Sequence, residues 1–260
     1  AEVAAKIFSD MESFASYAFN KSHAAAYAVV AYRTAYLKYF YPKEFLAGIL
    51  NDRLDKIEEI SKYIAYMKER GIEVLQPDIN RSKTIFAVEG KGLRIGLGAL
   101  RGIGIEAIES VILERDEHGE FADFADFNVR CAKYINKRIV ESLIYAGAFD
   151  CFGYPRSVFI AVYEEVLARV TAMEKQKSGN QISLFGNIIE EEKVVIDYPV
   201  IPEYDQAEKL SLEKSVLGVY VSGHPFEKYA PYFKDRTFNC SMLQYEEDEE
   251  TGEKKYTEIE

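Results

Sequence analysis

The stretch Leu100-Arg101-Gly102-Ile103-Gly104 determines the fold that we expect for this sequence, because it sets two glycines directly before a helix-forming segment. Glycine lets the backbone turn without a Cβ clash and come close to a phosphate. The first turn of the following helix adds free N–H groups and the positive end of the helix dipole. The pattern is typical of a helix-hairpin-helix motif, which holds a DNA backbone without reading its bases. The residues predicted to contact DNA are Arg94, Arg101, Gly102, Ile103 and Gly104.

The alternative for these residues is an ordinary glycine-rich turn before a helix. Residues 136–150 favour the motif, since Ile139, Leu143 and Ile144 lie at helical spacing and the segment ends in Ala-Gly-Ala. We interpret this segment as the second, degenerate half of a tandem hairpin pair. The helices expected in this region are 105–117, 121–130, 136–146 and 155–177, the last of which follows a proline suited to a first helical turn.

The remaining sequence is also mainly helical. Closely packed helices are expected within 1–51, including 24–40, and at 55–70, 203–217 and 225–232. Short β-prone runs separated by turn residues are expected to form strands at 72–75, 84–88 and 93–96. Gly71 is placed as a helix stop, and residues 256–260 resemble the second strand of an unfinished hairpin, as in a fragment. The expected fold class is therefore mainly α with a small β element, in several modules.

A polar cluster lies at the start of the second expected helix and consists of Asn20, Lys21, Ser22 and His23. Asn20 or Ser22 can cap that helix, which places Lys21 and His23 beside uncapped N–H groups. The start of this helix therefore favours binding of an anion, which we expect to be a phosphate. The alternative is a pair of ordinary helix caps with a solvated lysine, and with His23 packed against Tyr27.

The segment Gln181-Ile182-Ser183-Leu184-Phe185 is apolar, whereas residues 176–187 around it have the composition of a linker. Burial of Leu184 and Phe185 in a partner's pocket would contribute about 1.5–3 kcal/mol each. Gln181 would add a directional hydrogen bond. The segment therefore predicts a peptide ligand for a partner protein. The alternative is that Leu184 and Phe185 fold back onto their own domain.

The net charge of −11 is unevenly distributed. Lys and Arg against Asp and Glu number 10 to 10 in residues 1–75, 14 to 15 in 76–180 and 8 to 18 in 181–260. The first two thirds are thus near neutral, which leaves room for local basic patches.

Cysteine and histidine usage gives no support for a disulfide framework or a metal site. Cys131, Cys151 and Cys240 are odd in number and far apart, and only three histidines are present. No apolar run approaches the roughly 20 residues that a membrane span needs. We therefore expect a cytoplasmic protein that does not enter a membrane.

Five segments, in this order, closely resemble the bacterial replicative DNA polymerase III alpha subunits. They are 19–51, 93–104, 136–150, 181–185 and 218–226. Residues 19–28 are similar to the family's fingers motif, and 97–104 are similar to its helix-hairpin-helix element. Residues 181–185 look like its internal sliding-clamp-binding peptide, of the Gln-x-Ser/Asp-Leu-Phe type.

The resemblance implies a DNA-directed DNA polymerase, a nucleotidyltransferase of DNA replication. It places Asn20, Lys21, Ser22 and His23 on the side of the incoming nucleotide, the hairpin on duplex DNA, and Gln181, Ser183, Leu184 and Phe185 on the sliding clamp. The implied partners are primer-template duplex DNA, a deoxynucleoside triphosphate, the bacterial clamp and other replisome subunits. In this family Mg²⁺ is held by carboxylates of a palm domain that precedes the fingers. Since nothing here supplies them, we expect no catalytic or metal-binding residue and no activity in this chain alone.

The expected domains are the helical end of the fingers (1–75), a β element with a helix-hairpin-helix DNA-binding domain (76–177), a clamp-binding loop (178–187), a helical connector (188–237) and the truncated start of an OB-fold region (238–260). One alternative is a non-enzymatic scaffold that brings a clamp to DNA. Another is a helical interaction protein with no nucleic-acid role, for which the charge of −11 is the best argument.

Overall fold

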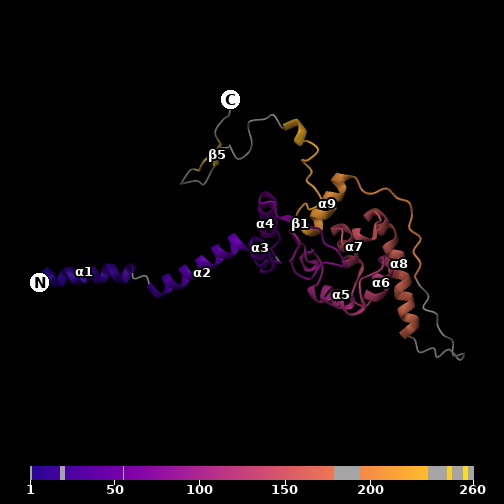
Figure 1. The fold of residues 1–260 in the computed structure, drawn as a ribbon, viewed down its shortest axis with the longest axis horizontal. Coiled ribbons are helices and arrows are strands. Elements are labelled where there is room, and N and C mark those ends of the chain that lie inside the picture. The colour runs from indigo at the N-terminus through magenta and orange to yellow at the C-terminus, as the bar shows by residue number, and fades with distance from the viewer. Residues whose placement is uncertain are drawn as a thin grey trace. The chain divides into compact units, whose positions relative to one another are not determined.

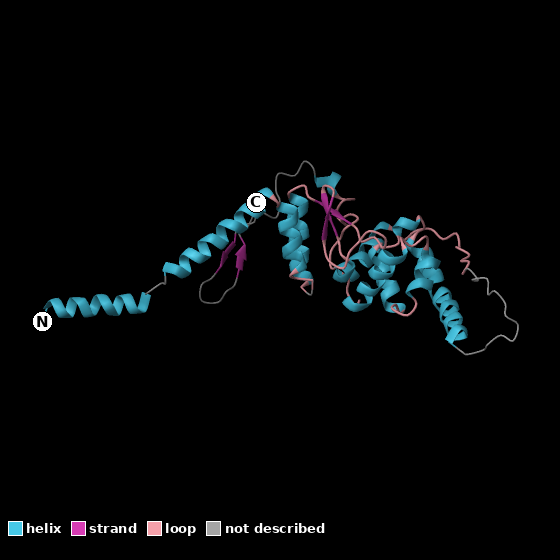
Figure 2. Ribbon diagram, turned by 60° about the horizontal axis from the view of Figure 1, so that its bottom comes forward, coloured by secondary structure: helices cyan, strands magenta, loops and turns pink. Residues whose placement is uncertain are grey.

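The computed structural model describes residues 2–17, 21–54, 56–178, 194–233, 245–247 and 254–256. It is mainly α with a small three-stranded sheet, which confirms the predicted fold class (Figure 1, Figure 2). Contacts divide the chain into two compact units, Ala1–Val221 and Ser222–Glu260. The finer boundaries at 75, 177, 187 and 237 stay predictions.

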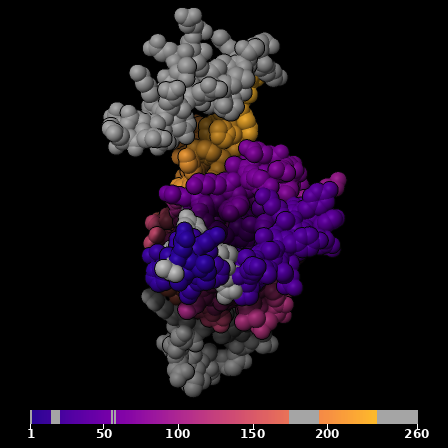
Figure 3. All heavy atoms as spheres, turned by 90° about the vertical axis from the view of Figure 1, so that its left-hand side faces the viewer, coloured from indigo at the N-terminus to yellow at the C-terminus, as the bar shows by residue number. Residues whose placement is uncertain are grey.

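The first unit opens with helices α1 (Glu2–Tyr17), α2 (Lys21–Phe40), α3 (Pro42–Asn51) and α4 (Ile57–Glu69). Pro42 starts α3 directly after α2, as the sequence predicts, because proline suits a first helical position and not a helix interior. Gly71 follows α4 with a φ of +69°, which agrees with its expected role as a helix stop. Of these helices α3 buries Leu46 and Leu50, whereas α2 buries no side chain. The N-terminal residues, indigo in Figure 3, lie at the surface of the face shown.

The sheet consists of β1 (Glu73–Leu75), β2 (Ala87–Glu89) and β3 (Gly92–Arg94). The central strand β3 runs parallel to β1 and antiparallel to β2. The strand expected at 84–88 is shorter and begins later, since the Thr84 carbonyl accepts a hydrogen bond from Gly98 N at 2.9 Å instead of joining the ladder. A Cβ on Gly98 would lie 2.7 Å from that same carbonyl oxygen, so this approach requires glycine.

The remaining helices of the first unit follow the hairpin. They are the 3₁₀ turn η1 (Leu97–Ala99), α5 (Ile105–His118), α6 (Phe124–Cys131), α7 (Lys137–Ala146), the 3₁₀ turn η2 (Asp150–Phe152), α8 (Arg156–Ser178) and α9 (Gln206–Leu217). Side-chain caps fix three of the starts, because Asp123 accepts from Asp126 N at 2.8 Å, Asn136 accepts from Ile139 N at 3.0 Å and Asp205 accepts from Glu208 N at 2.8 Å. Helix α7 packs against both α8 and α9.

One hydrophobic core runs through the first unit from Leu46 to Val219. Its aromatic centre is built by Phe124, whose ring lies 5.0 Å from that of Phe149 and 4.9 Å from that of Phe159. These three residues come from α6, α8 and the turn after α7, so the helices that flank the second hairpin share one buried centre. Leu46 of α3, Ile64 of α4 and Leu93 of β3 belong to the same core, so these helices and the sheet form a single packed unit.

The second unit contains the 3₁₀ helix η3 (Ala230–Phe233) and strands β4 (Tyr245–Glu247) and β5 (Lys254–Tyr256). Residues 225–232 do not form the α-helix that the sequence predicts, and instead make turns that lead into η3. Pro231 explains the difference, because it lacks the N–H that a continuing α-helix would use. Strands β4 and β5 pair antiparallel, in agreement with the expected hairpin near the end of the sequence.

Candidate nucleic-acid interface

The first hairpin presents its backbone at the surface. Leu100 is buried and anchors the turn, whereas Arg101, Gly102 and Gly104 are exposed. Gly102 has a φ of +77°, a conformation that favours glycine. Gly104 precedes α5 without any side-chain cap, and a Cβ built on it would meet nothing within 4 Å. The uncapped first turn of α5 therefore lies open beside a glycine that leaves room for a ligand.

The start of α7 lies against this hairpin. The Ser142 hydroxyl of α7 donates to the Arg101 carbonyl at 3.3 Å. In the first turn of the same helix, the Arg138 guanidinium lies over Gly102, and a Cβ on Gly102 would stand 2.6 Å from Arg138 Nε. Side chains of α7 thus contact the turn that precedes α5; the interpretation of residues 136–150 as a second hairpin stays a prediction.

Two cations on this surface are available to a ligand. Arg101 and Arg138 are exposed, and neither forms an ion pair within the part of the chain that the structure describes. Lys137 next to Arg138 differs, since it pairs with Glu164, which raises the lysine pKa and lowers that of Glu164. Sequence analysis missed Arg138. The available signal was its position two residues after the helix cap Asn136, at the start of the second predicted hairpin helix.

Arg94 lies in strand β3, and its side chain contacts residues of the neighbouring segments. It is 8 % exposed, and its guanidinium donates to the Gln76 carbonyl at 2.7 Å and to Glu89 Oε1 at 2.8 Å. The hydrogen bond from Arg94 lowers the pKa of the Glu89 carboxyl below its usual value of 4.5. These contacts occupy the guanidinium, so we leave Arg94 out of the interface and assign it to the stability of the sheet.

Comparison with known proteins agrees with this geometry. A family model for the helix-hairpin-helix motif matches residues 71–159, from the sheet to the start of α8. The chain is 41 % identical over 230 residues to the DNA polymerase III subunit alpha of Chlamydia pneumoniae, covering 87 % of this chain and 18 % of that protein. The subunits of Borreliella burgdorferi and Mycobacterium tuberculosis are 38 % and 41 % identical, over 88 % and 84 % of the chain and 20 % and 19 % of their own lengths.

Over most of its length the chain is similar to DNA polymerase III alpha subunits. It spans about a fifth of the length of these curated relatives. The match extends well beyond the hairpins, because the aligned part is more than twice the length of the helix-hairpin-helix match.

The residues that the resemblance to DNA polymerase III alpha subunits places near the nucleotide lie at the start of α2. This helix begins at Lys21, earlier than expected, so Lys21, Ser22 and His23 occupy its first turn and are exposed. The rings of His23 and Tyr27 lie 4.4 Å apart, which is the contact that the alternative interpretation expects. Asn20 lies outside the described residues.

The other features predicted from the resemblance fall partly outside the described residues. Gln181, Ser183, Leu184 and Phe185 lie outside the described residues, as does Cys240. Cys131 and Cys151 are free thiols, and burial raises the pKa of each to about 12. Among the residues that can be described, no group of three or more His, Cys, Asp and Glu side chains could hold a metal ion. None of the described helices is long and apolar enough to cross a bilayer.

Proposed function

We propose that this chain is the duplex-binding part of a DNA-directed DNA polymerase of replication, and that its paired hairpins hold the DNA backbone. The observation that carries the proposal is the position of the Arg138 guanidinium of α7, which lies over Gly102 in the turn before α5. The uncapped start of α5 and two exposed arginines on one surface form a site for consecutive phosphates. Such a site binds duplex DNA of any sequence.

At this surface each residue has a distinct role. The Gly104 backbone and the first N–H groups of α5 would donate hydrogen bonds to one phosphate, since no side chain shields them. Arg101 and Arg138 would pair with phosphates on either side. Ile103 is half-buried and packs on the core, so it holds the turn in place while the glycines face the ligand. Affinity would therefore depend strongly on salt and little on base sequence.

The proposal is tested by duplex binding of the 260-residue chain and an Arg101→Ala/Arg138→Ala variant at increasing salt, followed by fluorescence anisotropy. Losing two phosphate contacts should weaken binding about tenfold and reduce the salt slope by about 1.8, since each contact contributes about 0.9. Lys83→Ala/Lys91→Ala removes two exposed lysines elsewhere and serves as the control. Equal binding by the two double variants would refute the arginine assignment.

The Gly104→Ala variant tests whether a phosphate approaches the backbone at this position, because the substitution should leave the fold intact. Because its Cβ meets no protein atom, the substitution should cost no more than about 1 kcal/mol of stability, the difference between glycine and alanine at a helix cap. The added methyl group should still hinder a phosphate and weaken duplex binding.

We also propose that the start of α2 serves the same enzyme from the side of the incoming deoxynucleoside triphosphate. Lys21 and His23 would favour the triphosphate electrostatically, with Asn20 and Ser22 orienting the site. Their exposure in the first turn of α2 supports this role. Polymerases of this kind use Mg²⁺ to assist nucleotidyl transfer. The described residues do not form a set of ligands for that ion, so we assign them no metal-dependent step.

The segment 181–185 is proposed to attach the polymerase to the bacterial sliding clamp, beside contacts to other replisome subunits. We expect the chain to bind an immobilised clamp at micromolar concentration and a Leu184→Ala/Phe185→Ala variant to lose that binding, because both large apolar anchors are removed. Surface plasmon resonance would measure it. Ile188→Ala/Ile189→Ala, an apolar pair just beyond the segment, is the matched control and should bind normally. Binding that survives in the first variant would contradict the assignment.

A further inference from the structure

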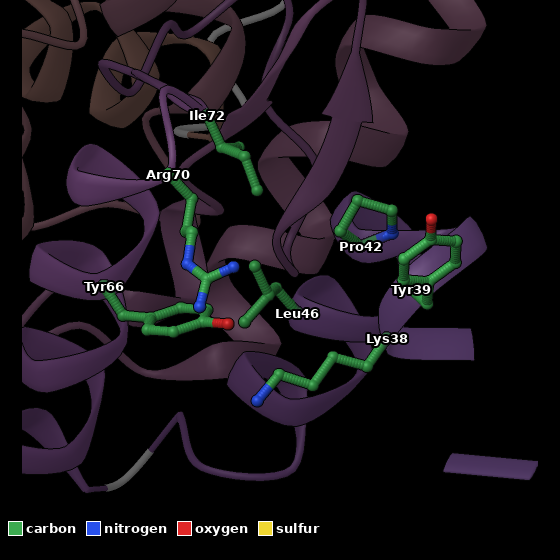
Figure 4. Close-up of a pocket in the computed structure, with 7 residues that line it drawn as sticks. All are labelled: Lys38, Tyr39, Pro42, Leu46, Tyr66, Arg70 and Ile72. Carbon is green, nitrogen blue, oxygen red and sulfur yellow. The ribbon is translucent and has the colours of Figure 1, made fainter. Parts of the chain in front are cut away.

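A hollow of about 300 Å³ lies between the end of α2 and helix α4, in a part of the chain that the hairpins do not use (Figure 4). Its floor is apolar, with Leu46 only 2 % exposed and Ile72 and Pro42 beside it. Its volume matches the lower end of the range for small-molecule and nucleotide-sized sites. The hollow can therefore accept a group about as large as a nucleoside phosphate.

Two positive side chains face each other across one aromatic ring in this hollow. Lys38 Nζ and Arg70 Cζ each lie 5.1 Å from the centre of the Tyr66 ring. Figure 4 shows the Arg70 guanidinium above that ring and the Lys38 ammonium below it. Both side chains are exposed, and no ion pair involves either of them within the described ranges. Both cations line the same hollow, so an anion bound there would offset their positive charge.

An aromatic platform stands at the rim of the hollow. Tyr39 is 79 % exposed, and its only described ring contact is with Phe40, at 4.8 Å and nearly edge-on. The flat face of Tyr39 is thus accessible to another ring. Cations beside an exposed aromatic ring are the combination by which proteins hold single-stranded nucleic acid, since phosphates pair with the charges and bases stack on the rings.

We propose that this hollow binds single-stranded nucleic acid, with backbone phosphates paired to Lys38 and to Arg70 and an adjacent base stacked on Tyr39. The preference for an anion with an aromatic base rests on the hollow itself, whereas the choice of nucleic acid rests on the proposed function. A continuous strand fits better than a free nucleotide, because Tyr39 stands at the open rim and does not enclose its ligand. This site is separate from the hairpin surface and uses none of its residues.

The test measures binding of the 260-residue chain to a fluorescein-labelled oligothymidylate by anisotropy at several salt concentrations. Lys38→Ala/Arg70→Ala should weaken binding about tenfold and lower the salt slope by about 1.4, since each phosphate contact to a single strand contributes about 0.7. Tyr39→Ala should weaken it at least about fivefold, and Tyr39→Phe should not, because stacking needs only the ring. Lys83→Ala/Lys91→Ala is the charge-matched control.

The result that overturns the proposal is equal oligothymidylate binding by Lys38→Ala/Arg70→Ala and by the control. Full displacement of the oligonucleotide by an equal concentration of thymidine monophosphate would also overturn it, in favour of a free-nucleotide pocket. Duplex binding distinguishes this failure from failure of the hairpin proposal. Gly104→Ala should weaken duplex binding and leave oligothymidylate binding unchanged, whereas Lys38→Ala/Arg70→Ala should do the reverse. Each variant should unfold at the same temperature as the wild-type chain. Thermal unfolding would then show that these exposed substitutions leave the fold intact.

Discussion

Replacing Glu213 by alanine should lower the free energy of unfolding by about 3–5 kcal/mol, because it removes a buried carboxylate that accepts three hydrogen bonds, and hydrogen bonds to a charged group contribute about 1.5–3 kcal/mol each. Glu213 is 0 % exposed and Arg156 is 1 % exposed. Arg156 Nη1 donates to Glu213 Oε1 at 3.1 Å, and the same carboxylate accepts from Gln76 Nε2 and from Val221 N, each at 3.2 Å. The carboxylate thus joins α9 to α8, to the segment after β1 and to the chain beyond α9. Urea unfolding followed by circular dichroism would measure the loss.

The control for this prediction lies on the same helix. Glu208 in the first turn of α9 is exposed, so Glu208→Ala should change stability by less than about 0.5 kcal/mol. An Arg156→Met/Glu213→Leu double substitution removes both charges and should recover part of the loss, because a buried pair replaced by apolar groups is often tolerated. Equal losses in Glu208→Ala and Glu213→Ala would show that the buried pair contributes little.

Replacing Gly147 by alanine is the second change that we expect to be severe. Gly147 ends α7 with a φ of +82°, a left-handed conformation that costs other residues about 1–2 kcal/mol. A Cβ there would overlap Arg156 Nη2, and it would lie 2.7 Å from Arg156 Cζ and 2.9 Å from Asp150 Oδ2. The substitution therefore displaces the buried guanidinium from Asp150, to which Nη2 donates at 2.7 Å. Thermal unfolding would measure the combined cost.

Gly153 provides a matched control for the conformational part of this cost. It has a nearly identical φ of +79° and ends the 3₁₀ turn η2, but a Cβ on it would meet nothing within 4 Å. Gly153→Ala should therefore show only the left-handed penalty. We expect Gly147→Ala to cost about 1.5–3 kcal/mol more, the usual value of a hydrogen bond to a charged group. If the two variants unfold at the same temperature, the guanidinium moves aside freely and the prediction is wrong.

Helix and hairpin positions could be predicted well from the sequence because their signals are local. Tyr41-Pro42, Gly71 and Asn136 mark a helix boundary by their own backbone or side-chain chemistry, and the structure places boundaries at or next to each of them. The misplaced elements are those in which a distant segment or a second proline takes part. The Thr84 carbonyl accepts a hydrogen bond from Gly98 N and not from a neighbouring strand. Pro231 prevents the α-helix expected over 225–232.

The candidate site was predicted only in part, for the same reason. The glycines of the first hairpin follow from the need for a tight turn before α5, which neighbouring residues alone impose. Arg94 and Arg138 were judged from their places in the sequence, although their roles depend on what packs against them. Folding turns Arg94 inward to Glu89 and brings Arg138 over Gly102, which is 36 positions away in the sequence.

The sequence by itself determined the mainly helical fold class, the first hairpin and the resemblance to DNA polymerase III alpha subunits, because turn chemistry and residue order are local properties of the chain. The tertiary structure alone decided which charged side chains are buried, which remain exposed and which surfaces they share. Glu213 and Arg156 lie 57 positions apart in the sequence, and only the packing of α8 and α9 brings them together. Lys38 and Arg70 likewise meet at Tyr66 only because folding brings the end of α2 near α4. Side-chain partners of this kind are set by packing between distant segments, which no local pattern encodes.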